Sequence, residues 1–494
     1  MSRFFIFAAS VFVSTFAFAA PPVLDATKQQ HAPVVRVNVT DQASDFLHPW
    51  TKRAPVSLRA LAPVIANRRV LVTAELVANA NYIELERAES GEKTAATVEV
   101  VDYEANLALL KPADEKFLAD VKPLELKTAV VGDRAAVWQL ESTGTLLITS
   151  ALISTVEVAR YPLDDTAFLI YRMTTPLQYR ESSFTLPLMK DNKLIGLLMR
   201  YDARAQNVDA VPTPVIEHFL KDAAGKNYRG FPRTGLHFDA TRDPQLRKYI
   251  GLNGGESGGV YVTKVLRNSP SEKAGVQAGD VILAVNGKPV DQDGNYFDSD
   301  YGKVSMVYLT ATKTQVGDTL KFKIFRDRKT IELNLVADHP DAQDFLIPPY
   351  VFDRAPRFYV LGGLVLQELS RQYLKEWGPE WSKKAPERFV YFDRYQDTLF
   401  QDDRKKLVIL SHVLPTPNTL GYEEVNNLVV TKINGVTLKS IEDVPAALEK
   451  PVDGFHKIEF SENPREIFLD PKEVEAGNAA LMRNYGLGAL KRLE

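Results

Sequence analysis

The C-terminal half of the chain contains the same pattern twice. Val262–Pro270 and Val408–Pro417 are apolar stretches that end in Ser-Pro and Thr-Pro. Each is followed by a glycine and then by an apolar strand that ends in Asn-Gly, at Asn286 and at Asn434, with the spacing conserved to within one residue. Asn-Gly is favoured where both residues of a turn need positive φ, so each pair predicts a tight reversal between two strands. The sequence therefore predicts two copies of one module.

The region before this repeat has a different pattern. Residues 34–222 contain short runs rich in Val, Leu, Ile and Thr between polar turns, which predicts an all-β barrel or sandwich. The expected strands are Val34–Val39, Val70–Thr73, Tyr82–Leu85, Thr97–Val101, Ala135–Trp138, Leu146–Thr149 and Leu194–Met199. We expect a closing helix over Pro214–Lys221, a linker over residues 222–227, and a second, proline-rich connector between Asp338 and Arg357.

Composition excludes several functional classes. The 494 residues suggest about three domains, and 60 Lys and Arg against 63 Asp and Glu give no basic surface of the kind that nucleic acid requires. The chain has no cysteine, which removes disulfides, iron–sulfur clusters and thiol nucleophiles. It has no HExxH motif, paired-histidine spacing or EF-hand loop, so we expect neither a metal site nor a cofactor.

The first residues have the pattern of a secretory signal peptide. Arg3 supplies a positive charge, Phe4–Phe16 forms an apolar segment, and Ala17-Phe18-Ala19 fits the small-x-small cleavage pattern. The alternative is an N-terminal membrane anchor, but the apolar segment is short for a span of roughly 20 residues. We expect residues 1–19 to be removed near Ala19, giving a periplasmic or secreted protein without stable membrane insertion.

The repeated modules resemble a known family. The run Ser269–Gly287 is similar to the PDZ domain of bacterial HtrA/Deg proteins. Further segments are similar to the Deg proteases of plants, and these are Tyr228–Leu236, Asp243–Lys248, Gly421–Val425 and Ile467–Asp470. The resemblance implies a mainly β fold: a chymotrypsin-like double β-barrel at 34–222, a PDZ domain at 228–337 and a PDZ-like domain at 357–494, the last two being α+β.

PDZ domains bind an extended peptide beside a sheet edge and receive its terminal carboxylate on a loop of backbone N–H groups. The resemblance places that loop at Tyr228-Arg229-Gly230-Phe231 in the first module and at Leu361–Leu364 in the second. Gly230 suits this role, because backbone amides approach an anion closely where no Cβ intervenes. The alternative is that the glycines only form turns and that the grooves are blocked or filled by the chain itself.

In HtrA/Deg proteins the barrel domain carries a serine protease triad, and the resemblance indicates where its members would lie. Leu71–Ala80 is similar to the segment with the catalytic histidine, whose position holds Glu75. Asp102–Lys111 is similar to the segment with the catalytic aspartate, whose position holds Asn106.

The nucleophile position is Ser183 when it is counted back from Ile195-Gly196, or Phe184 when Pro187 is aligned with the Gly-x-Ser-Gly-Gly-Pro turn of the family. Neither alignment restores the glycines of that turn, whose backbone N–H groups form the oxyanion hole.

These changes predict a pseudoprotease. A serine hydroxyl needs a positioned base, and no histidine lies between residues 49 and 217. The alternatives are a Ser–Lys dyad with Lys190 or Lys193, Glu75 as the base, and a histidine from elsewhere, such as His48 or His218.

Two functional hypotheses follow from the resemblance. The first is an exported chaperone, adaptor or scaffold of envelope protein quality control that binds unfolded proteins or peptide C-termini through PDZ modules. Members of the family assemble through the barrel domain, so this hypothesis includes a homo-oligomer, a trimer or a multiple of it. The second is a serine endopeptidase that uses Ser183 and an unconventional base.

Overall fold

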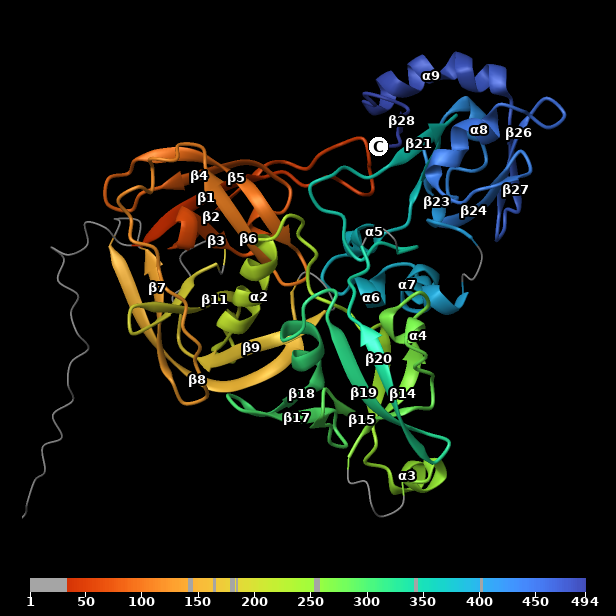
Figure 1. Ribbon diagram of the computed structural model, residues 1–494. Helices are drawn as coiled ribbons and strands as arrows, with labels where there is room; N and C mark the ends of the chain where they lie inside the picture. Colours follow the sequence, from red (N-terminus) through yellow and green to blue (C-terminus); the bar gives the residue numbers. More distant parts are fainter. Residues whose placement is uncertain are drawn as a thin grey trace, which may run out of the picture.

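The structure is a computed structural model that describes residues 33–140, 145–162, 166–177, 183, 185–252, 258–341, 345–399 and 403–494. The expected signal peptide lies outside these residues. The chain forms three parts, which we call the barrel unit (33–223), the first module (228–341) and the second module (345–494) (Figure 1). The predicted fold, a double β-barrel followed by two α+β modules, is confirmed.

The first barrel is a closed sheet with the strand order β1-β2-β3-β6-β5-β4. Its strands are β1 (Val34–Asp41), β2 (Val56–Ile65), β3 (Arg69–Val72), β4 (Ala80–Glu86), β5 (Lys93–Asp102) and β6 (Leu107–Pro112). Val37, Leu85 and Leu110 are fully buried in its interior core. The short helix α1 (Ala74–Val77) follows β3 at one end of this barrel.

The second barrel is also closed, with the order β10-β11-β12-β9-β8-β7. Its strands are β7 (Arg134–Leu140), β8 (Leu146–Arg160), β9 (Ala167–Thr174), β10 (Pro187–Lys190), β11 (Lys193–Asp202) and β12 (Asn207–Pro212). The helix α2 (Thr213–Ala223) then covers this barrel with Val215, Ile216 and Phe219.

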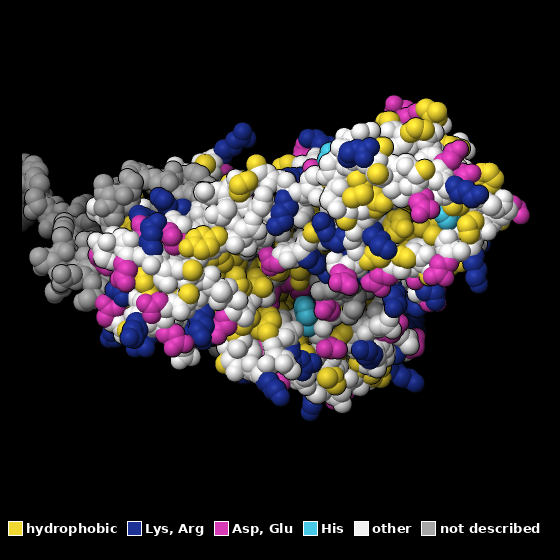
Figure 2. Space-filling model, turned by 90° about the horizontal axis from the view of Figure 1, so that it is seen from above, with side chains coloured by type: hydrophobic (Ala, Val, Ile, Leu, Met, Phe, Trp, Pro, Cys, Tyr) yellow, Lys and Arg dark blue, Asp and Glu magenta, His cyan; other side chains and the backbone are white. Residues whose placement is uncertain are grey.

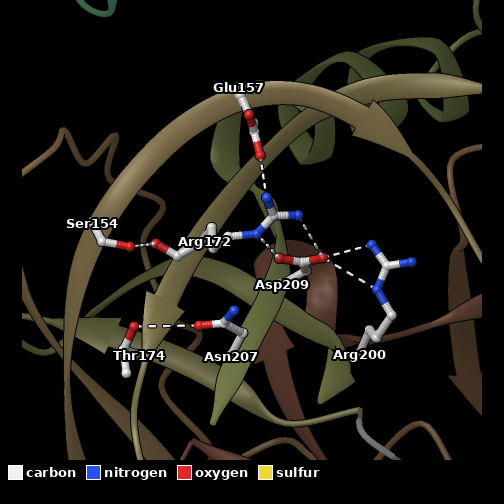
Figure 3. Close-up of polar contacts among 7 residues, drawn as sticks. All are labelled: Ser154, Glu157, Arg172, Thr174, Arg200, Asn207 and Asp209. Carbon is white, nitrogen blue, oxygen red and sulfur yellow. Dashed lines mark hydrogen bonds and ion pairs between the residues drawn. The ribbon is translucent and has the colours of Figure 1, made fainter. Parts of the chain in front are cut away.

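A ladder of charged side chains joins four neighbouring strands of the second barrel (Figure 3). Asp209 on β12 accepts hydrogen bonds from Arg172 on β9 (2.8 Å) and from Arg200 on β11 (2.5 Å), and Arg172 also pairs with Glu157 on β8. Burial alone would raise the pKa of Asp209, but the hydrogen bonds from the two arginines hold it below its usual value. The ladder therefore keeps a nearly buried carboxylate charged and links β8, β9, β12 and β11.

The first module is built on one sheet with the strand order β13-β14-β15-β19-β20 and the short β16 beside β15. Its strands are β13 (Leu236–Ala240), β14 (Val260–Val265), β15 (Val281–Val285), β16 (Lys288–Pro289), β19 (Thr319–Arg326) and β20 (Lys329–Val336). Its helices are α3 (Pro244–Ile250), α4 (Pro270–Lys273) and the π-helical η3 (Tyr308–Thr312). A separate hairpin, β17 (Asn295–Asp298) and β18 (Gly302–Ser305), lies beside β8 of the barrel unit (Figure 1).

The second module repeats this sheet and extends it, with the order β27-β26-β24-β23-β22-β21-β28. The strands are β21 (Phe358–Leu361), β22 (Leu364–Glu368), β23 (Val408–Val413), β24 (Leu428–Ile433), β25 (Val436–Thr437), β26 (His456–Phe460), β27 (Glu466–Leu469) and β28 (Lys491–Arg492). The helices are α5 (Arg371–Leu374), α6 (Trp381–Lys384), α7 (Glu387–Leu399), α8 (Val444–Leu448) and α9 (Pro471–Tyr485). The helices α5–α7 are an insertion between β22 and β23 and lie between the sheets of the two modules (Figure 1).

The surface does not concentrate one sign of charge on the face seen in Figure 2, where basic and acidic side chains are interspersed. In the part of the chain that the structure describes, no helix is long and apolar enough to cross a membrane.

Candidate functional site

The residue at the expected histidine position projects from α1. Ala74, Leu76 and Val77 of this helix are buried, which leaves Glu75 half-buried at its surface. Burial raises the pKa of the Glu75 carboxyl to about 7, and no hydrogen bond to that carboxyl is found within the described residues. The Glu75 carboxyl therefore takes up a proton more readily than an exposed glutamate does.

The residue at the expected aspartate position lies beside it. Asn106 is fully buried in the turn between β5 and β6, with a left-handed φ of 54°. Its Oδ1 accepts a hydrogen bond from the backbone N–H of Glu75 at 3.0 Å, whereas its buried Nδ2 has no partner within the described residues. The turn is shaped by Asp102, whose Oδ1 accepts from the N–H groups of Glu104 and Ala105, both at 2.8 Å. Asn106 therefore binds the backbone of Glu75, and no hydrogen bond between the described residues joins it to the Glu75 carboxyl.

Ser183 comes from the second barrel, shortly before β10. Its buried hydroxyl donates to Oγ1 of Thr185 and accepts from the N–H of Thr185, both at 3.2 Å. The Thr185 hydroxyl in turn bonds to Oγ1 of Thr73, the residue before α1. This chain of hydroxyls brings Ser183 and the Glu75 helix to one junction between the barrels. Phe184, the other nucleophile candidate, lies outside the described residues.

The geometry does not connect a nucleophile to a base. General-base catalysis requires a hydrogen bond of about 2.6–3.2 Å between the hydroxyl and the base. Within the described residues no hydrogen bond joins Ser183 to Glu75, because the proton of Ser183 is donated to Thr185. Lys190 and Lys193 pair instead with Asp133 (2.5 Å) and Glu125 (2.7 Å).

The two histidines considered as alternative bases also have other contacts. His218 lies on α2, where its Nδ1 contacts the carbonyl of Thr312 at 2.8 Å. His48 belongs to the connection between β1 and β2 and lies against His412 of the second module. In the described residues no group of three metal-ligating side chains is found.

The loop Tyr228–Phe231 is held by the barrel unit. The Tyr228 hydroxyl donates to Oδ2 of Asp102 at 2.5 Å, and the buried ring of Phe231 stacks on His218 with centroids 4.0 Å apart. The N–H groups of Arg229 and Gly230 donate to one oxygen of Asp222 at 2.6 and 2.7 Å. A peptide carboxylate could bind these two N–H groups only by displacing Asp222.

Sequence reasoning missed Asp222, which it assigned to a linker. It lies in the last turn of α2, and its carboxylate binds a loop that follows in the chain. The segment Asp222–Asn227 gave no signal that distinguishes this contact from an exposed linker.

Sequence reasoning also missed which edge strands of the two module sheets are open and which are paired with a further strand. Among the residues that the structure describes, the strand β13 ends the sheet of the first module and pairs only with β14. The Gly235 carbonyl accepts a hydrogen bond from the N–H of Leu266, on the β14 side. Successive residues of a strand direct their main-chain groups to opposite sides, so the N–H groups of Leu236, Phe238 and Ala240 point away from β14. This edge has the unpaired main-chain groups that a peptide strand needs.

In the second module the corresponding strand β22 is paired on both sides. β21 is joined to it by the two-residue turn Gly362-Gly363 and occupies the edge that is open in the first module. β28, near the C-terminus, then pairs with β21. The predicted loop at Leu361–Leu364 is thus the turn of a hairpin.

Comparison with known proteins agrees with the two-module architecture. Residues 233–336 and residues 347–490 each match the PDZ domain as a sequence family. The chain is 26% identical to the protein named Protease Do-like 2, chloroplastic, of Arabidopsis thaliana, over 92% of this chain and 74% of that protein. It is 24% identical to Protease Do-like 4, mitochondrial, of the same plant, over 84% of this chain and 76% of that protein.

Two solved protease structures show some likeness to this chain. One is the HtrA-type protease AlgW with tripeptide, 18% identical, with a TM-score of 0.48 over 63% of this chain and 95% of that one. Another is the serine endoprotease from Yersinia pestis, 17% identical, with a TM-score of 0.43 over 65% of this chain and 100% of that one.

Proposed function

The chain belongs to the HtrA/Deg family, and we propose that it is a non-catalytic member that binds unfolded polypeptides or peptide C-termini through its first PDZ module. It would act as a chaperone, adaptor or scaffold in protein quality control of the cell envelope. The barrel unit would serve as a rigid support for the PDZ modules.

The observation that carries this proposal is the hydrogen bonding of Ser183. Its hydroxyl donates to Thr185, and the positions of the two other triad members hold Glu75 and Asn106. Loss of a triad member typically reduces the rate by a factor on the order of 10⁴–10⁶. Here the base, its orienting residue and the glycines of the nucleophile turn are all replaced.

The open edge of β13 supports peptide binding. An extended peptide can form main-chain hydrogen bonds with the outward N–H groups of Phe238 and Ala240, and such bonds are largely independent of the peptide's sequence. A site of this kind suits unfolded clients of varied composition.

The export and the assembly of the protein are part of the proposal. The basic and apolar pattern of residues 1–19 supports cleavage near Ala19 and a periplasmic or secreted location. Family membership supports a homo-oligomer, a trimer or a multiple of it, formed through the barrel unit.

The test is incubation of the purified protein and of its Ser183→Ala variant with unfolded casein, followed by electrophoresis and light scattering. We expect no fragments, and equal suppression of casein aggregation by both proteins. Cleavage that disappears in Ser183→Ala would overturn the proposal, and so would a failure of both proteins to suppress aggregation.

One observation favours a second function, that of a serine endopeptidase with Glu75 as its base. Burial raises the pKa of Glu75 to about 7, where a general base is effective near neutral pH. This function requires the Ser183 hydroxyl to leave Thr185. It predicts casein cleavage that rises with pH around 7 and is abolished in Glu75→Gln, whereas the non-catalytic function predicts no cleavage at any pH.

A further inference from the structure

The loop Tyr228–Phe231 of the first module already binds a carboxylate. The backbone N–H groups of Arg229 and Gly230 both donate to Oδ2 of Asp222, at 2.6 and 2.7 Å. Gly230 has a left-handed φ of 78°, a conformation that glycine adopts without a steric cost. Two successive N–H groups that converge on one oxygen form the kind of site in which a protein backbone captures an anion or the terminal carboxylate of a peptide.

Asp222 is bound by main-chain groups and not by a cation. No ion pair of Asp222 is found within the described residues, and the guanidinium of the neighbouring Arg229 lies instead 3.7 Å from Asp338. Asp222 is also in the last turn of α2, where the partial negative charge of the helix end disfavours a carboxylate. The two N–H groups of the loop are therefore the groups that stabilise its charge.

The loop keeps its shape through contacts on its other side. The Tyr228 hydroxyl donates to Asp102 at 2.5 Å, and the buried ring of Phe231 stacks on His218 with centroids 4.0 Å apart. None of these contacts involves Asp222. Its removal should therefore leave the two N–H groups in place and available to another carboxylate.

The loop lies where the end of a bound peptide would lie. Only residues 232–235 separate Phe231 from β13, whose outer edge is unpaired among the described residues. A peptide that pairs antiparallel with β13 has its C-terminal end at the N-terminal end of that strand. Its terminal carboxylate would be directed to the end of the sheet at which this loop is found, and there the N–H groups are bound to Asp222.

Asp222 has an advantage over any peptide in the competition for this loop. It is separated from Arg229 and Gly230 by only seven and eight positions in the chain. This short connection gives its carboxylate an effective concentration on the order of millimolar or more. A peptide at micromolar concentration does not displace it, and the peptide carboxylate would lose hydration without gaining a partner.

We propose that Asp222 is a built-in occupant of this loop and that the first module consequently selects internal segments of unfolded chains over free C-termini. The client binds through main-chain hydrogen bonds along β13, and a terminal carboxylate adds nothing to its affinity. This selectivity rests on the proposed function, because its ligand is an unfolded client bound to β13. It narrows the clients to extended segments at any place in an unfolded chain.

The test compares two forms of one peptide. A fluorescein-labelled nine-residue peptide of alternating valine and serine is prepared with a free C-terminal carboxylate and with a C-terminal amide, and binding is followed by fluorescence anisotropy. The original protein should bind both forms with affinities that agree within about twofold. In Asp222→Ala the free-acid form should bind about tenfold more tightly than the amide, because the vacated N–H groups form charge-assisted hydrogen bonds with its carboxylate.

Asp222→Asn is the matched control. It removes the same charge as Asp222→Ala, but its side-chain oxygen can still accept from the N–H groups of the loop, so the free-acid form should gain less than about threefold. Melting temperatures show whether each variant is folded. If Asp222→Ala does not fold, hydrogen exchange in the original protein decides: the free-acid peptide should slow exchange in Leu236–Ala240 and leave that of Arg229 and Gly230 unchanged.

The proposal is overturned if the original protein prefers the free-acid form by about tenfold, if folded Asp222→Ala shows no such preference, or if neither form binds to any of the proteins. It is also overturned if Asp222→Asn gains as much as Asp222→Ala, since Asp222 would then repel the peptide carboxylate without occupying the loop. Failure of the proposed function is seen separately. If Asp222→Ala creates the free-acid preference but casein aggregation is not suppressed, the selectivity of the loop stands and the chaperone function fails.

Discussion

The two PDZ modules share the same core sheet but differ at its edge. In both, the strand after the glycine-containing loop pairs with the next strand through a register shift at an equivalent place, between His237 and Phe238 in β13 and between Val365 and Leu366 in β22. In the first module the sheet ends there. In the second it continues through β21 and β28.

The difference shows that the ability of a PDZ module to accept a strand is not determined by its repeated core. It depends on the segments that flank that core. Phe358–Leu361 precedes the second core and Lys491–Arg492 follows it, and these segments supply the strand that a peptide would otherwise supply. Covering an edge in this way also protects it from unwanted pairing.

The largest expected effect comes from a proline in the covered strand. Leu366 is fully buried and pairs with Tyr359 of β21, so Leu366→Pro removes a central ladder bond and leaves a cavity. We expect a loss of more than about 4 kcal/mol in the free energy of unfolding, measured by urea denaturation. Leu366→Ala is the control, with a loss of about 2–4 kcal/mol from the cavity alone. Equal stability of Leu366→Pro and Leu366→Ala would contradict the pairing of β22 with β21.

Much of the fold could be predicted because its signals are local. The two Asn-Gly pairs predicted tight reversals, and Asn286, Gly287, Asn434 and Gly435 all have positive φ in the structure. The short apolar runs predicted for residues 34–222 fall in strands of the two barrels.

What could not be predicted depends on residues far apart in the sequence. β28 pairs with β21 across more than a hundred residues, and neither segment shows its partner in its own pattern. The hydrogen bond of Thr73 to Thr185 likewise joins two barrels, so the contact between the start of the Glu75 helix and the segment of Ser183 was not visible beforehand. The resemblance to the HtrA/Deg family identified Glu75, Asn106 and Ser183 as the residues at the triad positions. Their role, including the loss of protease activity, stays a prediction.

A second difference between the modules concerns pH. When the Asn-Gly turns are aligned, Lys264 in β14 of the first module corresponds to His412 in β23 of the second module. Burial and the nearby His48 lower the pKa of His412 to about 4 from an ordinary 6.5. The unfolded chain therefore binds a proton first as pH falls, and stability present above pH 6.5 is lost progressively down to about pH 4.

We expect this loss to reach at most about 3.5 kcal/mol, because the two pKa values differ by about 2.5 and one pKa unit corresponds to about 1.4 kcal/mol. Urea denaturation of the second module's transition at pH 7 and pH 4.5 measures it. His412→Gln is the control, in which the additional acid sensitivity should shrink. An unchanged pH dependence in that variant would show that His412 does not distinguish the modules.

Removal of residues 490–494 tests the outer strand of the covered edge. It deletes the acceptor of the Val360 N–H, the Leu490 carbonyl at 2.7 Å, and the Arg492 guanidinium that lies over Phe358. We expect a loss of about 2 kcal/mol and faster hydrogen exchange at Val360, with exchange at Leu366 little changed because β21 still covers β22. Rapid exchange at Leu366 would mean that β21 stays in place only with the tail.

The smallest expected effect concerns the open edge of the first module. The N–H of Ala240 points away from β14, so Ala240→Pro removes a group that a bound peptide would use while the pairing with β14 is retained. One lost hydrogen bond of about 1 kcal/mol corresponds to affinity weakened about fivefold for a peptide with a free C-terminus, measured by fluorescence anisotropy. Ala240→Val, which keeps the N–H, should bind as the original protein does. If both variants bind normally and have unchanged melting temperatures, peptides do not add to β13, and the open edge would then be no more available to ligands than the covered edge of the second module.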